Sequence, residues 1–198
     1  MAGYSVTVDG VAAPIIALAN QNGVEQINAQ VPFETLPGTS STIVIQTPQG
    51  SVTINSVTIS LFAPGIFTNG TLAAAGGPYA LATALRPDGS YVSASNPAQP
   101  GETITIFATG LGQTAPPTGT GTPGVAGQTV ANTILATVNN QSAAVVSAIY
   151  QPGALGDYAI QLQVPLTTVV GPAQPVALFM VDSTGADYKS PAAFIPIK

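Results

Sequence analysis

The stretch QINAQVPFETLPG, residues 26–38, returns later in the chain as AIQLQVPLTTVVG, residues 159–171. Each copy has apolar and polar side chains in alternation up to a proline, which cannot donate a hydrogen bond within a sheet and so ends or edges a strand. The flanks repeat as well, because Thr7-Val8-Asp9-Gly10 precedes the first copy as Thr137-Val138-Asn139-Asn140 precedes the second. One structural unit is therefore predicted to occur twice.

Short strands separated by turns extend outward from the repeated stretch. Strict alternation resumes at residues 102–109, where Ile104 and Ile106 share one face of a strand. Asp9-Gly10 is typical of a two-residue hairpin turn, and glycine and proline recur throughout, so helix content should be very low. The pattern predicts an all-β protein of two tandem immunoglobulin-like β-sandwiches, the first of which lacks an opening strand.

The repeat predicts a division of the chain into three segments. Residues 1–61 are expected to form the first sandwich, which is incomplete because the first copy shows no counterpart of the strand at 102–109. Residues 62–96 are expected to be a structured connector, and residues 97–198 are expected to form the second sandwich.

Smaller features of the pattern predict local structure and the core. The apolar residues change phase near Asn55-Ser56, which predicts a β-bulge, and residues 110–127, rich in Gly, Thr and Pro, predict a long exposed loop. The residues at inward-facing positions are expected to be buried: Val6, Val8, Ile27, Val31, Ile43, Ile45, Ile104, Ile106, Phe107, Ile160, Leu162, Val164 and Leu178.

The chain has very few charged side chains. Of its 198 residues 6% are charged and 45% are hydrophobic, and the formal net charge is −5. Arg86, Lys189 and Lys198 are the three cations, so no basic stripe is available for nucleic acid or anionic membrane. No apolar run reaches the roughly 18 residues of a membrane span. The distributed apolar surface is therefore expected to be buried against protein, in a homo-oligomer or homopolymer.

The residue types that most catalytic and metal sites need are missing. The chain has no His and no Cys, which excludes the serine triad, thiol nucleophiles and most transition-metal sites. Glu25 and Asp157 precede the two copies at similar places, but in different units, and are expected to be solvated turn residues. The stretch 182–187 is expected to form a β-turn rather than a calcium site. No enzyme activity, catalytic residue, metal or cofactor is predicted.

Glycines and aromatic residues offer two further alternatives. The spacing Gly110-Leu111-Gly112 does not precede a helix, so a phosphate site is not expected. The tyrosines at 79, 91, 150, 158 and 188 would suit either a sugar-binding platform or packing in the core, and packing is favoured because the chain has no Trp. A surface glycan or protein ligand, bound by an adhesin-like module of a larger secreted protein, is the alternative function.

Four motifs resemble the Solibacter-type uncharacterised C-terminal domain family. They are residues 62–67, FAPGIF; residues 96–102, NPAQPGE; residues 108–113, ATGLGQ; and residues 156–165, from Gly-Asp-Tyr to Gln-Val-Pro. The resemblance covers roughly residues 61–198. It implies an immunoglobulin-like module of a secreted bacterial protein, and it brings no catalytic residues with it.

The missing strand suggests how the protein assembles. A sandwich that lacks one strand exposes backbone donors and acceptors, and a strand of a neighbouring copy can fill the place, as in donor-strand complementation. The sequence predicts an extracellular structural protein that forms a surface fibre or layer, sharing residues 1–10 or 61–96 between subunits. The candidate assembly residues are Val6, Val8, Phe62, Ile66 and Phe67.

Composition also predicts the compartment. Uncharged Thr, Ser, Asn, Gln, Gly and Pro dominate the polar positions, which is typical of a secreted or cell-surface protein. Met1-Ala2-Gly3 leads into a strand without the basic start and apolar core of a signal peptide. Secretion would then require that a leader was removed or that the chain belongs to a longer one.

Overall fold

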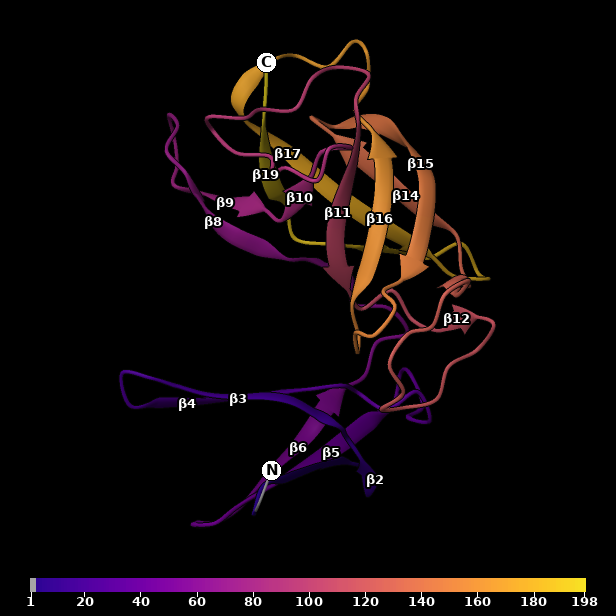
Figure 1. Ribbon diagram of the computed structural model, residues 1–198. Helices are drawn as coiled ribbons and strands as arrows, with labels where there is room; N and C mark the ends of the chain where they lie inside the picture. Colours follow the sequence, from indigo (N-terminus) through magenta and orange to yellow (C-terminus); the bar gives the residue numbers. More distant parts are fainter. Residues whose placement is uncertain (1–2) are drawn as a thin grey trace.

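The computed structural model describes residues 3–198, except for the side chain of Gln21. Every regular element in this part of the chain is a β-strand, so the predicted all-β class is confirmed (Figure 1). The strands lie in two bodies, an N-terminal unit and a C-terminal unit, which are stacked end to end in this view. Residues 3–198 contain no helix that is long and apolar enough to span a membrane.

The N-terminal unit is built from six strands. They are β1 (Ser5–Val8), β2 (Val11–Ala12), β3 (Ile15–Gln21), β4 (Val24–Ala29), β5 (Ser40–Thr47) and β6 (Gly50–Thr58). One sheet has the order β2-β1-β5-β6, and β3 and β4 form a separate two-stranded hairpin. Val6, Val8, Ala13 and Ile59 form its small buried core, against which Ile15, Ile27, Ile43 and Ile45 are only partly buried.

The C-terminal unit is a larger two-layered structure. Its main strands are β11 (Thr103–Thr109), β14 (Ile134–Val138), β15 (Gln141–Tyr150), β16 (Tyr158–Gln163), β17 (Gly171–Val181), β18 (Asp187–Lys189) and β19 (Ala193–Ile197). Figure 1 shows β11, β16 and β15 in front of β17 and β19. Ile104, Ile106, Ile160, Leu162 and Leu178 are fully buried between the layers, so inward alternation along each strand produces the core.

Residues 62–96, expected as a connector, lie in the sheets of the C-terminal unit. They form β7 (Gly65–Ile66), β8 (Thr68–Leu72), β9 (Tyr79–Ala82) and β10 (Ala84–Leu85). β7 and β10 pair with β11, and β9 pairs with β19. The physical reason is burial, because Phe62, Leu72, Ala82, Ala84 and Val92 enter the C-terminal core or its edge.

The predicted bulge is confirmed at β5 and β6. The pairing shifts between Ser41 opposite Val57 and Ile43 opposite Ile54, and Ser56 has a φ of 60°. One residue of β5 therefore faces two of β6, which is the definition of a bulge.

The predicted exposed loop at 110–127 is more ordered than its composition suggests. β12 (Thr114–Ala115) pairs with β13 (Thr129–Val130), and the Gln113 side chain accepts the backbone N–H groups of Thr114 and Thr118 at 2.8 and 3.1 Å. Polar side chains thus satisfy the backbone without regular structure. The loop also contacts the N-terminal unit, where Gly121 N–H donates to Gln30 Oε1 at 2.8 Å.

Most of the predicted core residues are buried, and the exceptions lie mainly in the N-terminal unit. Ile27, Ile43 and Ile45 are half-buried, and Val31 is exposed, so its predicted burial is wrong. Phe107 is half-buried because it faces the outer side of β11. Every other predicted core residue is buried.

Candidate functional site

Part of the strand pairing in the N-terminal unit recurs in the C-terminal unit in the same register. β1 pairs with β5, placing Val6 opposite Ile45 and Val8 opposite Ile43. β14 pairs with β17 in the same way, placing Ala136 opposite Leu178 and Val138 opposite Val176. The repeated sequence therefore folds as a repeated substructure.

The turns that begin each copy match as well. Asp9 and Gly10 both have positive φ, and so do Asn139 and Asn140, which suits a two-residue hairpin turn. The N–H of Asp9 donates to Thr42 O at 2.9 Å, and the N–H of Asn139 donates to Pro175 O at 2.7 Å. After the strands, Thr35 N–H donates to Pro32 O as Thr168 N–H donates to Pro165 O. β4 is thus the counterpart of β16.

The two counterparts differ at their outer edges. β16 has β15 on one side and β11 on the other, and β11 is aligned with it over six residue pairs, from Thr103 opposite Gln163 to Ala108 opposite Tyr158. β4 pairs with β3, and no described strand lies on its other side. The outer edge of β4 is the candidate functional site.

The backbone groups of alternate β4 residues face this open edge. The N–H of Gln30 donates to Pro14 O at 2.9 Å on the β3 side, and Val24 closes the hairpin opposite Gln21. Backbone direction alternates along a strand, so the even-numbered residues face β3. The N–H and C=O groups of Glu25, Ile27 and Ala29 therefore point to the free edge.

Apolar side chains on the core-facing side of β6 are exposed. Val52 and Ile54 of β6 stand opposite Ile45 and Ile43, so they share the core-facing side of the sheet with Val6. They are nevertheless 56% and 43% exposed. The chain passes from β2, at one edge of this sheet, directly into the β3–β4 hairpin.

A groove of about 260 Å³ lies elsewhere in the N-terminal unit. Tyr4, Ser5, Val6, Ala12, Ala13 and Ile15 line it. These residues belong to the start of β1 and the passage from β2 to β3, so this groove is distinct from the β4 edge. It carries no charged side chain and no titratable cluster.

The candidate assembly residues lie in two different places. Val6 and Val8 are buried in the N-terminal unit, and Phe62 is buried in the C-terminal core. Ile66 pairs with Ala108 within the C-terminal unit, and Phe67 is exposed beside it. The structure does not bring these five residues together, and sequence reasoning missed β4 because alternation alone does not show which strand lacks a neighbour.

A second candidate surface lies on the outer face of the front layer of the C-terminal unit. Thr105, Phe107, Ser147, Ile149, Gln151, Ala159 and Gln161 line a groove of about 220 Å³ there. Ser147 Oγ donates to Gln161 Oε1 at 3.1 Å, which leaves the amide N–H₂ of Gln161 available. The groove thus combines one aromatic ring with uncharged polar groups.

The five tyrosines do not form a platform. Tyr150 and Tyr158 are buried with ring centroids 5.0 Å apart, Tyr79 packs against Phe194, and Tyr188 packs against Phe62. Burial raises the pKa of the Tyr158 hydroxyl, which donates to Gly112 O. Tyr91 alone among the five is largely exposed, at 57%.

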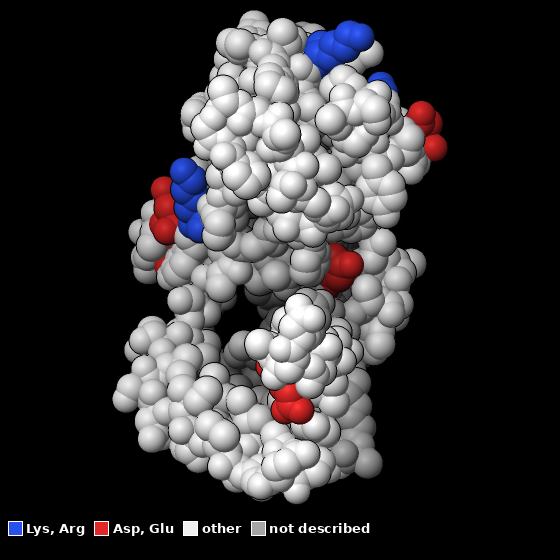
Figure 2. All heavy atoms as spheres, turned by 90° about the vertical axis from the view of Figure 1, so that its left-hand side faces the viewer, with Lys and Arg blue, Asp and Glu red and all other residues white. Residues whose placement is uncertain are grey.

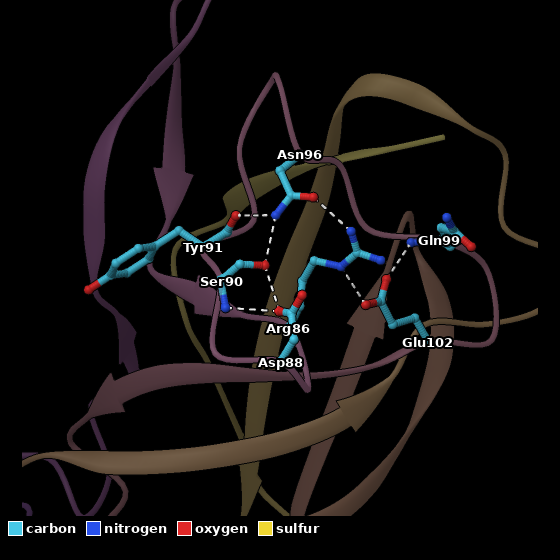
Figure 3. Close-up of polar contacts among 7 residues, drawn as sticks. All are labelled: Arg86, Asp88, Ser90, Tyr91, Asn96, Gln99 and Glu102. Carbon is cyan, nitrogen blue, oxygen red and sulfur yellow. Dashed lines mark hydrogen bonds and ion pairs between the residues drawn. The ribbon is translucent and has the colours of Figure 1, made fainter.

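An ion pair fixes the segment that carries Tyr91 (Figure 3). Arg86 Nε donates to Glu102 Oε1 at 2.7 Å, and Arg86 Nη1 donates to Asn96 Oδ1 at 2.7 Å. Asn96 Nδ2 in turn donates to Tyr91 O at 3.0 Å. The network ties the end of β10 to the start of β11, so its geometry is that of a structural clamp.

The carboxylates do not gather into a reactive site. No group of three or more metal-ligating side chains occurs among the described residues. Asp182 Oδ1 accepts hydrogen bonds from the Thr184 hydroxyl and the N–H groups of Thr184 and Ala186, which lower its pKa; it therefore forms the predicted turn. Burial raises the pKa of Asp157, whose Oδ1 has no partner.

The few charged residues are scattered over the surface. Figure 2 shows a few acidic and basic groups spread over this side of the molecule, one basic group lying against acidic ones, and a hollow between the two units. This surface offers no strong electrostatic field to attract a charged ligand.

Comparisons with known proteins identify no family for this chain. No family model and no curated protein matches it. Among solved structures, the chain is similar to SGBP-B of the Bacteroides ovatus mixed-linkage glucan utilization locus, solved in complex with a mixed-linkage heptasaccharide. The identity is 12% and the TM-score is 0.29, over 99% of this chain and 37% of that one. The chain therefore spans little more than a third of that protein's length.

Proposed function

We propose that the protein is a non-enzymatic structural module of the cell exterior, secreted or surface-attached, which assembles with other polypeptides by accepting a β-strand at the β4 edge. The single observation behind this proposal is that β4 has one neighbour, β3, where its counterpart β16 has two. An unpaired edge is a template for strand addition.

The proposal includes two tandem immunoglobulin-like sandwiches, of which the N-terminal one is incomplete. The matched register of β1 with β5 and β14 with β17 supports this. The resemblance to the Solibacter-type C-terminal domain stays a prediction, and a secreted module of that kind fits the proposed location.

A second copy of the chain is the first partner to test, because head-to-tail contacts that do not close produce a fibre. In the single chain, β1 pairs with β2 and β5, and the strands of residues 61–96 pair within the C-terminal unit. Sharing residues 1–10 or 61–96 between subunits would therefore require a strand to leave its own sheet.

Light scattering coupled to size-exclusion chromatography, with electron microscopy, tests assembly. The full chain should form species whose mass rises with concentration. Val52→Lys places a charge beside the open edge and should reduce the mass, whereas Val125→Lys, at an equally exposed position in the C-terminal unit, should not. A monomer at every concentration would contradict self-assembly.

We also propose a second candidate function, binding of a neutral glycan in the groove around Phe107. The observation that favours it is the combination of the Phe107 ring with the amides of Gln151 and Gln161 and the hydroxyls of Thr105 and Ser147. Aromatic rings stack on the apolar faces of sugars, and uncharged polar groups bond their hydroxyls.

A glycan array with the full chain tests this candidate. Phe107→Ala should abolish binding, and Gln161→Ala should weaken it. Tyr91→Ala should have no effect, because Tyr91 does not line the groove. Tyr150 is buried, so its substitution would test folding instead. Binding that survives Phe107→Ala, or no binding at all, would exclude this groove as a glycan site.

A further inference from the structure

We infer that the place beside β4 takes an extended segment of a second polypeptide whose chemistry matches that of β11: uncharged, apolar at alternate positions and antiparallel to β4. The inference rests on the proposed function, since it names the strand that the open edge accepts. It goes further by fixing the pattern, direction and register of that strand.

The repeat supplies the register. Ile27 and Ala29 correspond to Ile160 and Leu162, because residues 26–38 align with residues 159–171. In the C-terminal unit Ile160 is opposite Ile106, and Leu162 is opposite Ile104. The bound segment should therefore place two apolar side chains opposite Ile27 and Ala29, with one polar residue between them.

The composition of the edge excludes a charged segment. Within residues 15–31 the one ionisable side chain is Glu25, and residues 50–58 contain none. A Lys or Asp that faced inward between these strands would lose its hydration without gaining a partner, which is strongly unfavourable. An apolar side chain there would instead cover Val52 and Ile54, which face the core side but remain exposed.

The direction of the backbone groups in β11 shows which bonds the segment must make. Glu102 C=O accepts from Val164 N–H on the β16 side, whereas Phe107 N–H donates to Thr83 O on the far side. Backbone direction alternates along a strand, so Ile104 and Ile106 face β16, and Thr105 and Phe107 face away from it. The same alternation should apply to a segment bound against Glu25, Ile27 and Ala29.

A synthetic peptide of residues 103–109, the uncharged β11 sequence, extended at one end by two lysines for solubility, is the probe. It should bind the full chain with one-to-one stoichiometry, measured by calorimetry. Hydrogen exchange should slow at the amides of Glu25, Ile27 and Ala29, whose N–H groups are free in the single chain.

Two isomeric peptides are the matched controls. N-methylation at Ile104 and Ile106 removes the two donors that should face β4, so affinity should fall at least about tenfold. N-methylation at Thr105 and Phe107 adds the same two methyl groups but removes N–H donors that face away from β4. Binding of this isomer should persist. Equal binding of both isomers, or no binding of the unmodified peptide, would overturn the inference.

The Val52→Lys and Val125→Lys variants separate this inference from the proposed function. The first should weaken peptide binding and the second should leave it unchanged. One outcome would be that the chain self-associates, that Val52→Lys prevents this association, and that the peptide nevertheless does not bind. In that case the inferred strand is wrong but the proposed function stands. If the peptide binds with the expected protection while the chain never associates, self-assembly is wrong and the inferred strand stands.

Discussion

Val31 and Val164 occupy equivalent positions in the two copies, yet Val164 is fully buried, at 0% exposure, whereas Val31 is 49% exposed. Each stands immediately before the proline that follows its strand. The difference arises because β11 lies on the outer side of β16, with Val164 N–H donating to Glu102 O, while no described strand lies on the outer side of β4.

The same substitution at these two positions should have very different effects. Val164→Ala removes two methyl groups from a closed core and should lower the free energy of unfolding by about 2 kcal/mol. Val31→Ala should change it by less than about 0.5 kcal/mol. Urea denaturation followed by circular dichroism measures both, and equal losses would show that Val31 is buried in solution.

Two glycines test the packing of the C-terminal unit. A Cβ at Gly110 would overlap the carbonyl oxygen of Ala63, and its φ is +74°. Gly110→Ala should therefore lower the free energy of unfolding by more than about 3 kcal/mol. Gly127 has a φ of +89° and no atom within 4 Å of an added Cβ. Gly127→Ala should therefore lower the free energy of unfolding by only about 1 to 2 kcal/mol. Similar losses in thermal or urea denaturation would argue against the close approach at Ala63.

The contact between the units should depend on pH. Thr120 Oγ1 donates to Glu34 Oε2 at 2.6 Å, and this bond holds the pKa of Glu34 below its ordinary value of 4.5. A lowered carboxyl pKa means that the contact contributes fully above pH 4.5 and is lost as the pH falls through the folded-state pKa. The amide of Phe33, which donates to Thr120 Oγ1 at 2.9 Å, should then be less protected, meaning that its exchange rate rises relative to that of an unstructured amide at the same pH.

Thr120→Val should lower the protection of the Phe33 amide against exchange at neutral pH, and that protection should no longer change as the pH falls below 4.5. Thr118→Val is the matched control, because the Thr118 hydroxyl has no hydrogen-bond partner. NMR-detected hydrogen exchange measures both, and a pH dependence that survives in Thr120→Val would assign it to another group.

The clamp around Arg86 should behave as a unit. Arg86→Met leaves Glu102 without its 2.7 Å ion pair and Asn96 Oδ1 without its donor, so the melting temperature should fall. Glu102→Met leaves the guanidinium unpaired and should have a similar effect. The melting temperature of the double variant should fall by less than the sum of the two single decreases, because the double variant leaves neither charge unpaired. Additive losses in differential scanning calorimetry would show that the two groups do not interact.

The sequence predicted the strands and the repeat because both depend on local pattern. Alternation located β4 and β11 within a few residues, and the change of phase located the bulge at Ser56. The place of residues 62–96 in the C-terminal sheets was not predictable, since it depends on which strands pair over long separations. The order of the 110–127 loop was missed because it depends on the Gln113 side chain.

The sequence predicted that the first unit lacks a strand, but it did not predict which strand would be left with an open edge. Comparison of the two copies predicts a missing strand, and in the structure β1 pairs with β2 and β5, whereas β4 pairs with β3 alone among the described strands. The groove at Phe107 was not predicted, because it gathers residues of three strands that pattern analysis assigns only to the outer face.

If the edge of β4 accepts a strand as proposed, the stability of the N-terminal unit should depend on how much of that strand is present. A ligand that binds only the folded form stabilises it by an amount that grows with the logarithm of ligand concentration, about 2.7 kcal/mol at a hundredfold excess over the dissociation constant. The temperature at which this unit melts should therefore report how much complementary strand is present. Protease resistance should follow the same dependence, so unpartnered molecules would be degraded first and assembled ones would persist.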